Sequence, residues 1–94
     1  MLDFYFIPDE LSNMTSSMHL KYAGCIEEEE FEMAQKAGLI ENHADYYGRF
    51  RWSRSQVLNK VELLANCPFR MSIALNEVLT QAKATDMGLL AIGD

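Results

Sequence analysis

Cysteine and long hydrophobic runs are both scarce in this 94-residue sequence. The two cysteines, Cys25 and Cys67, are too few for a disulfide framework, and no cysteine or histidine spacing resembles a zinc site. No stretch approaches the roughly 20 apolar residues that a membrane-spanning helix needs. Residues 1–10 lack the basic start and the small-residue cleavage site of a signal peptide. We therefore expect a cytoplasmic protein with no membrane role.

Basic residues are also few, with eight against fourteen acidic residues and a net charge of −6 at pH 7. The imbalance is concentrated in one half of the chain, since residues 1–48 sum to −8 and residues 49–94 sum to +2. An acidic surface repels phosphate backbones and speeds the encounter with basic proteins. The charge pattern therefore predicts a basic protein partner and no nucleic-acid partner.

The length and the 49% content of apolar residues predict a single domain, residues 1–94, with one hydrophobic core. Apolar residues recur at helical spacing in four segments, approximately residues 11–23, 26–37, 53–66 and 68–85. Residues 2–7 alternate like a strand, and the short apolar run at 88–94 is consistent with a second strand that could pair with them. We expect a mainly α fold, a compact bundle of three to four helices, to which these strands could add a small two-stranded sheet joining the N- and C-termini.

Three helix boundaries are specified most clearly. Residues 27–30 are four glutamates that would fill the first turn of the second helix, where unpaired backbone N–H groups and the helix dipole favour carboxylates. Gly38 is placed to end that helix as a left-handed cap. Ser53 and Gln56 form the S-x-x-Q pattern of a capping box and predict the start of the third helix. The first predicted helix depends on an apolar stripe of Leu11, Met14, Met18 and Tyr22, with many Ser and Thr residues in between.

The glutamate run EEEEFE at Glu27–Glu32 raises the question of a metal site. Consecutive helical residues point about 100° apart, so at most Glu28 and Glu32 can share one line, and no Glu-x-x-His motif is present. We predict no metal ion and no cofactor. A solvated helix start and an acidic docking surface both fit the same geometry, and the sequence leaves these two interpretations open.

A second candidate cluster comprises His43, Asp45 and Tyr46, whose side-chain types can exchange protons once their environment tunes them. The sequence contains no G-x-S-x-G nucleophile, no H-E-x-x-H motif and no glycine-rich phosphate loop. No specific motif therefore supports the alternative of an enzyme that uses His43 and Asp45. We predict that the protein is not an enzyme.

The segment Tyr46–Arg54 interleaves arginines with aromatic residues. This composition suits nucleic-acid binding, the hot spots of protein interfaces, or a core whose arginines pair with the acidic half of the chain. The net charge disfavours nucleic acid, and the other two interpretations stay open. The partner-binding residues that we predict are Glu27, Glu28, Glu29, Glu32, Glu41, Asp45, Tyr46, Tyr47 and Trp52.

In its size, in EEEEFE at Glu27–Glu32 and in DYYGRFRW at Asp45–Trp52, the chain resembles the small acidic cytoplasmic immunity proteins of bacterial toxin–immunity pairs, including those of contact-dependent inhibition. The resemblance is one of general character and implies no residue-by-residue correspondence. It implies a non-catalytic protein that binds and neutralises a basic toxin, such as a nuclease, through an acidic face. A small regulatory or structural subunit of a protein complex is the alternative.

Overall fold

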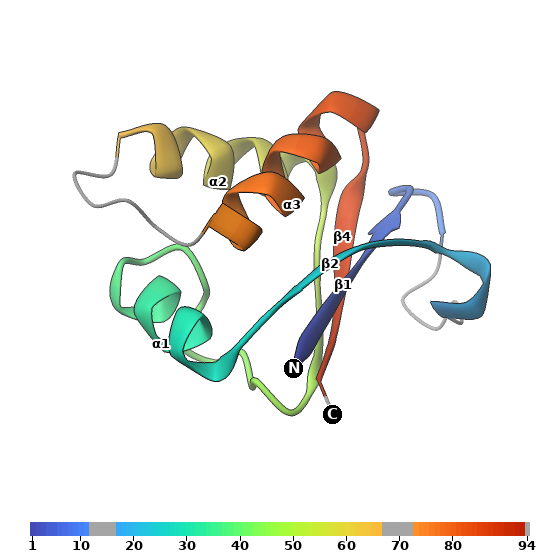
Figure 1. Ribbon diagram of the computed structural model, residues 1–94. Coiled ribbons are helices and arrows are strands. Elements are labelled where there is room, and N and C mark those ends of the chain that lie inside the picture. Colours follow the sequence, from blue (N-terminus) through green and yellow to red (C-terminus); the bar gives the residue numbers. More distant parts are fainter. Residues whose placement is uncertain (12–16, 67–72, 94) are drawn as a thin grey trace.

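The computed structural model describes residues 1–11, 17–66 and 73–93, and within these ranges the chain forms one four-stranded sheet, three α-helices and one turn of 3-10 helix (Figure 1). In chain order the elements are β1 (Leu2–Ile7), the 3-10 turn (Ser17–His19), β2 (Lys21–Ile26), α1 (Glu28–Lys36), β3 (Arg49–Trp52), α2 (Arg54–Ala65), α3 (Ile73–Thr85) and β4 (Gly88–Gly93). The strand order is β2-β1-β4-β3, and every neighbouring pair is antiparallel.

The fold is therefore mixed α/β, and the expected mainly α bundle is wrong. Strand β2 lies where the end of the first helix was expected, and β3 lies between the second and third predicted helices, where no strand was expected. An isolated two-stranded ribbon is marginally stable in water because both of its outer edges stay unpaired. Here β2 pairs with the outer edge of β1, and β3 pairs with the outer edge of β4. Over residues 21–23, this pairing between distant segments outweighs the weak helical pattern of the sequence.

Other expectations are confirmed. Strands β1 and β4 pair along their whole length, from Leu2 opposite Gly93 to Ile7 opposite Gly88, so the two ends of the chain lie side by side (Figure 1). Ser53 caps α2 through the predicted capping box. Gly38 follows α1 with a φ of 82°, in the left-handed region.

The last predicted helix, residues 68–85, is confirmed over residues 73–85 as α3, which buries four apolar residues at helical spacing. These residues are Leu75, Val78, Leu79 and Ala82. The predicted start at Pro68, like Met14 in the first predicted helix and Cys67, lies outside the described residues. None of the helices in the described part of the chain combines the length and apolar character needed to cross a membrane.

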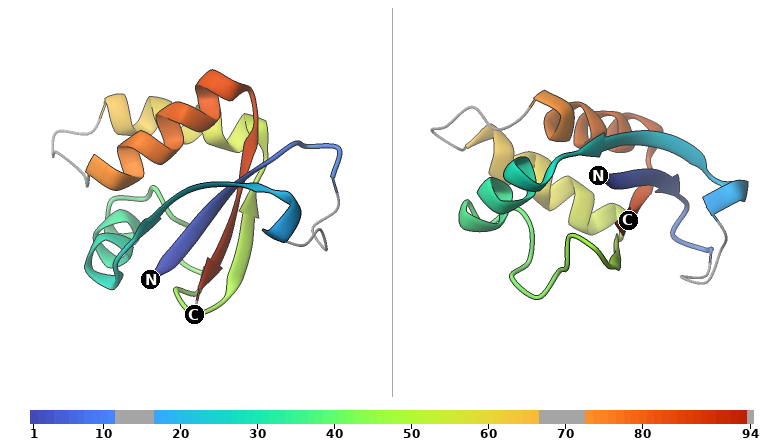
Figure 2. Two further views of the ribbon diagram at one scale, coloured as in Figure 1. Left: turned by 45° about the vertical axis from the view of Figure 1, so that its right-hand side comes forward. Right: turned by 60° about the horizontal axis from the view of Figure 1, so that its bottom comes forward.

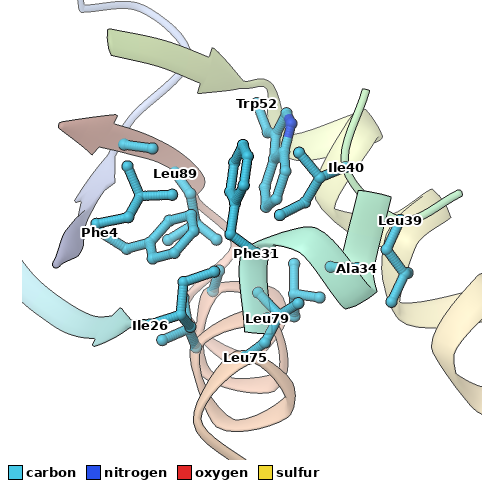
Figure 3. Packing of buried hydrophobic residues seen from close by; sticks show 14 of the residues in the cluster. Phe4, Ile26, Phe31, Ala34, Leu39, Ile40, Trp52, Leu75, Leu79 and Leu89 are labelled. Atoms are coloured by element: carbon cyan, nitrogen blue, oxygen red, sulfur yellow. The ribbon is translucent and has the colours of Figure 1, made fainter. Parts of the chain in front are cut away.

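All three α-helices lie on one face of the sheet, and the core fills the space between the two layers (Figures 1 and 2). Because side chains alternate along a strand, β1 directs Leu2, Phe4 and Phe6 into this core. From the opposite side, Phe31 of α1 points toward Phe4 and Trp52 (Figure 3). The aromatic ring of Phe4 lies 5.7 Å from that of Trp52, measured between centroids.

The other face of the sheet carries no α-helix from the described residues. At one end of it, the Arg51 guanidinium donates hydrogen bonds to the carbonyl oxygens of Leu11 at 2.6 Å, Pro8 at 3.0 Å and Asp9 at 3.2 Å. Ile7 and Leu90 are fully buried but do not belong to the core cluster under the helices. Residues 8–11 therefore cover this end of the second face. No α-helix of residues 1–11, 17–66 and 73–93 covers the remainder, which we call the open face.

Candidate functional site

A hollow of about 330 Å³ lies between α1 and the segment that leads to β3. Its lining consists of Glu28, Phe31, Glu32 and Gln35 from α1 together with Ala44, Asp45, Tyr46 and Tyr47. We call this the acidic hollow. It brings together five of the nine predicted partner-binding residues, namely Glu28, Glu32, Asp45, Tyr46 and Tyr47.

The segment opposite α1 is held in place by its own hydrogen bonds. The Gln35 side-chain amide donates to the carbonyl oxygens of Glu41 at 3.0 Å and Ala44 at 3.1 Å. The Asp45 carboxylate accepts a hydrogen bond from the Tyr47 backbone N–H at 3.0 Å, a local turn that aspartate commonly forms. The hollow is thus lined by a fixed loop and by one side of a short helix.

The two tyrosines of the hollow have different roles. Tyr46 is only 8% exposed and packs edge-on against Phe31, with ring centroids 5.4 Å apart, so it belongs to the core. Tyr47 is 63% exposed, and its hydroxyl donates a hydrogen bond to Glu28 Oε2 at 2.6 Å. The hydrogen bond to this carboxylate raises the pKa of Tyr47, because removing the phenol proton would place two negative charges side by side. Tyr47 and Glu28 therefore form a link across the rim of the hollow.

The glutamate run divides between two environments. Glu28 and Glu32, one helical turn apart, line the hollow as their i, i+4 spacing predicted. Glu27 and Glu29 are exposed, and Glu27 makes no side-chain cap on α1. Glu27 and Glu29 thus add negative charge at the positive end of the helix outside the hollow, whereas Glu28 and Glu32 face into it.

Glu41 and Trp52 lie away from the hollow, in a polar cluster around Lys60. The Lys60 ammonium donates to Leu39 O at 2.6 Å and to the two Glu41 carboxylate oxygens at 3.1 and 3.0 Å. It also lies 4.4 Å from the Trp52 ring centroid, and Trp52 Nε1 donates to Glu41 Oε1 at 2.9 Å. Trp52 is 2% exposed, so it is a core residue rather than a surface anchor.

The pKa of Glu41 reflects this cluster. Burial by itself raises the pKa of the carboxyl, but hydrogen bonds from Lys60 and Trp52, together with a backbone hydrogen bond, outweigh it and leave the pKa lowered. Lys60 is not among the predicted site residues, although the sequence contains a signal for it. Lys60 follows Val57 by three residues and precedes Leu64 by four, so helical spacing places it on the apolar face of α2.

His43 lies in a different and smaller hollow. That hollow measures about 90 Å³ and is lined by Glu41, His43, Ala44, Phe50, Arg51, Trp52 and Gln56. The residues of the enzyme alternative are thus divided, with His43 here and Asp45 and Tyr46 in the acidic hollow. Across residues 1–11, 17–66 and 73–93, no three His, Cys, Asp or Glu side chains are grouped so that they could hold a metal ion.

Comparisons with known proteins add no relative. No protein-family model matches the sequence, and neither the curated proteins nor the solved structures gave a match.

Proposed function

We propose that the protein is a non-catalytic binding module that docks a basic segment of another protein on the acidic hollow. The observation that carries this proposal is the grouping of three carboxylates and three aromatic rings in the lining of one hollow. The carboxylates belong to Glu28, Glu32 and Asp45, and the rings belong to Phe31, Tyr46 and Tyr47. A lysine or arginine side chain entering such a hollow pairs its cation with the carboxylates. Its apolar stem then packs against the rings of Tyr46 and Tyr47.

The charge surrounding the hollow favours the same class of partner. Exposed carboxylates at Glu27 and Glu29 extend the negative field beyond the hollow itself. Such a field raises the rate of encounter with a basic protein more than it raises affinity, and salt weakens it because the screening length is about 10 Å at 0.1 M ionic strength.

More specifically, we propose an immunity protein that neutralises a basic toxin. The chain resembles such proteins in its small size and its acidity. Its acidic surface would cover the substrate-binding surface of a nuclease, where the substrate phosphates otherwise lie. A regulatory or structural subunit with a basic partner would use the same surface. The two forms differ in one assay, because only an immunity protein abolishes a toxic activity of its partner.

The test begins with affinity capture from the native organism and mass spectrometry of the captured proteins, followed by association kinetics with the purified partner. We expect Glu28→Lys with Glu32→Lys to slow association about tenfold at low salt, because steering depends on local charge. The matched control is Glu62→Lys with Glu77→Lys, which changes the net charge equally at exposed positions on α2 and α3.

Equal slowing by both double variants would mean that overall charge, and not the acidic hollow, governs association. Unchanged association in Glu28→Lys with Glu32→Lys would remove the hollow from the interface. Nuclease or other toxic activity of the partner, measured with and without the wild-type protein, then separates the immunity form from the subunit form.

A further inference from the structure

The face of the sheet opposite the helices carries an ordered row of side chains. On the helix side, Leu2, Phe4 and Ala91 enter the core, so their neighbours in sequence point the other way. The cross-strand register then sets Asp3 of β1 beside Ile92 of β4, and Ile92 beside Arg49 of β3. A negative, an apolar and a positive side chain therefore follow one another across three adjacent strands of this open face.

The order of this row makes the face complementary to itself. Neighbouring strands lie about 4.8 Å apart, so Asp3 and Arg49 flank Ile92 at similar distances on opposite sides. A two-fold axis that runs along β4, between two copies packed face to face, exchanges the two sides. Each Asp3 then lies opposite Arg49 of the second copy, and the two Ile92 side chains meet at the axis.

We infer that this open face binds a second copy of the chain and forms an isologous dimer. Stacked sheets pack about 10 Å apart, a gap that a long arginine side chain can cross to reach a short aspartate. The Asp3 carboxylate is already oriented, because the Tyr22 hydroxyl donates to Asp3 Oδ1 at 3.0 Å. Tyr22 in turn packs edge-on against Tyr5, with ring centroids 5.4 Å apart. A face with charges of one sign, or with no charges, could not form opposite-charge pairs with a second copy of itself.

The dimer leaves the acidic hollow accessible, because α1 lies on the opposite side of the sheet (Figure 2). The inference therefore stands independently of the proposed function. Since residues 8–11 already cover one end of the open face, the contact is small. Small interfaces are weak, so we expect dissociation constants between about 10 μM and about 1 mM.

Sedimentation velocity of the purified protein over this concentration range, at low salt, tests the inference. We expect the wild-type protein to shift from monomer to dimer. Arg49→Asp and Asp3→Arg should each remain monomeric, because each sets two pairs of like charges in contact across the axis. An equimolar mixture of these two variants should form a heterodimer, because both of its charge pairs are then opposite in sign. Lys36→Asp makes the same charge change as Arg49→Asp on the exposed side of α1 and should leave the dimer intact.

A wild-type protein that stays monomeric over the whole range would overturn the inference. So would a dimer that Arg49→Asp weakens no more than Lys36→Asp does, since the contact would then lie elsewhere. Recovery of association in the mixture supports the two-fold arrangement, and failure of recovery by two folded variants contradicts it. If Asp3→Arg does not fold, as judged by thermal unfolding, the comparison of Arg49→Asp with Lys36→Asp still decides the question.

Discussion

Removing the carboxylate of Glu41 should destabilise the protein far more than removing the ammonium of Lys60, although the two groups form one ion pair. The Lys60 side chain is 7% exposed and the Glu41 side chain is 32% exposed. In Glu41→Ala, the Lys60 ammonium stays buried and loses its two hydrogen bonds to the carboxylate, while the one to Leu39 O remains. In Lys60→Met, the Glu41 carboxylate can turn toward water. The cost of breaking the pair therefore depends on which partner is left behind.

The magnitudes follow from burial. Breaking a buried ion pair by removing one partner costs about 3–5 kcal/mol, and the partial exposure of Glu41 brings the expected loss for Glu41→Ala to about 3 kcal/mol. Lys60→Met keeps an apolar stem of similar length, so we expect a loss of about 1 kcal/mol. The double variant should be more stable than Glu41→Ala alone, because it no longer buries an unpaired charge.

Urea unfolding at neutral pH measures these free energies, with the fluorescence of Trp52, the single tryptophan, as the signal. A loss of about 3 kcal/mol corresponds to a fall in Tm of roughly 15 °C in a domain of this size. Circular dichroism provides a second signal, since both variants change the surroundings of Trp52. Equal losses for the two single variants, or a double variant less stable than Glu41→Ala, would refute the reasoning from the buried ammonium.

The same cluster predicts a pH dependence. The pKa of Glu41 is lowered in the folded protein from an unfolded value near 4.5. Its ionised form therefore contributes stability that is complete above this value and is lost as the pH falls through the lower folded pKa. Glu41→Gln should flatten this part of the stability profile in acid, and a profile as steep as that of the wild-type protein would contradict the assignment.

Gly24 has a φ of 149°, and a Cβ there would lie 2.8 Å from the nearest side-chain atom, so Gly24→Ala should cost about 1–3 kcal/mol in urea unfolding. Gly38 has a φ of 82° and open space around it, so Gly38→Ala should cost only about 1 kcal/mol; a larger loss at Gly38 would contradict the comparison. Ser53→Ala removes the capping side chain of α2 and should cost about 1 kcal/mol, whereas an unchanged unfolding midpoint would show that the cap adds nothing. Glu28→Gln should lower the pKa of Tyr47, followed by NMR titration of the ring, because the carboxylate beside the phenol is neutralised; an unchanged pKa would refute this cause.

Local signals in the sequence predicted the parts of the fold that depend on neighbours in the chain. The Ser53 capping box, the Gly38 cap and the alternation of residues 2–7 each act over a few residues, and each is present in the structure. Strands β2 and β3 could not be predicted in this way, because their conformation depends on pairing with strands far away in the sequence. Long-range pairing routinely overrides weak local preference.

In the candidate site too, local spacing was predictable from the sequence and burial by distant residues was not. The i, i+4 spacing of Glu28 and Glu32 placed them together, and both line the hollow. The sequence could not tell whether Tyr46 or Tyr47 is buried, because both follow the same acidic segment and only packing against Phe31 separates them. The sequence likewise left open whether Trp52 is a core residue or an interface anchor, because only packing decides between them. Its burial beside Lys60 assigns it to the core.

The acidic hollow depends on the cluster around Lys60 although the two do not overlap. Lys60 binds Leu39 and Glu41 in the segment that follows α1. Gln35 of α1 binds the backbone carbonyl oxygens of Glu41 and Ala44 in the same segment. Loss of the Glu41 carboxylate should therefore loosen the loop that carries Asp45 and Tyr47, and reduce partner binding together with stability. Charge reversal within the hollow acts on exposed groups and should reduce binding alone. Partner affinity and unfolding free energy, measured on the same variants, should thus fall together in Glu41→Ala and separate in the hollow variants.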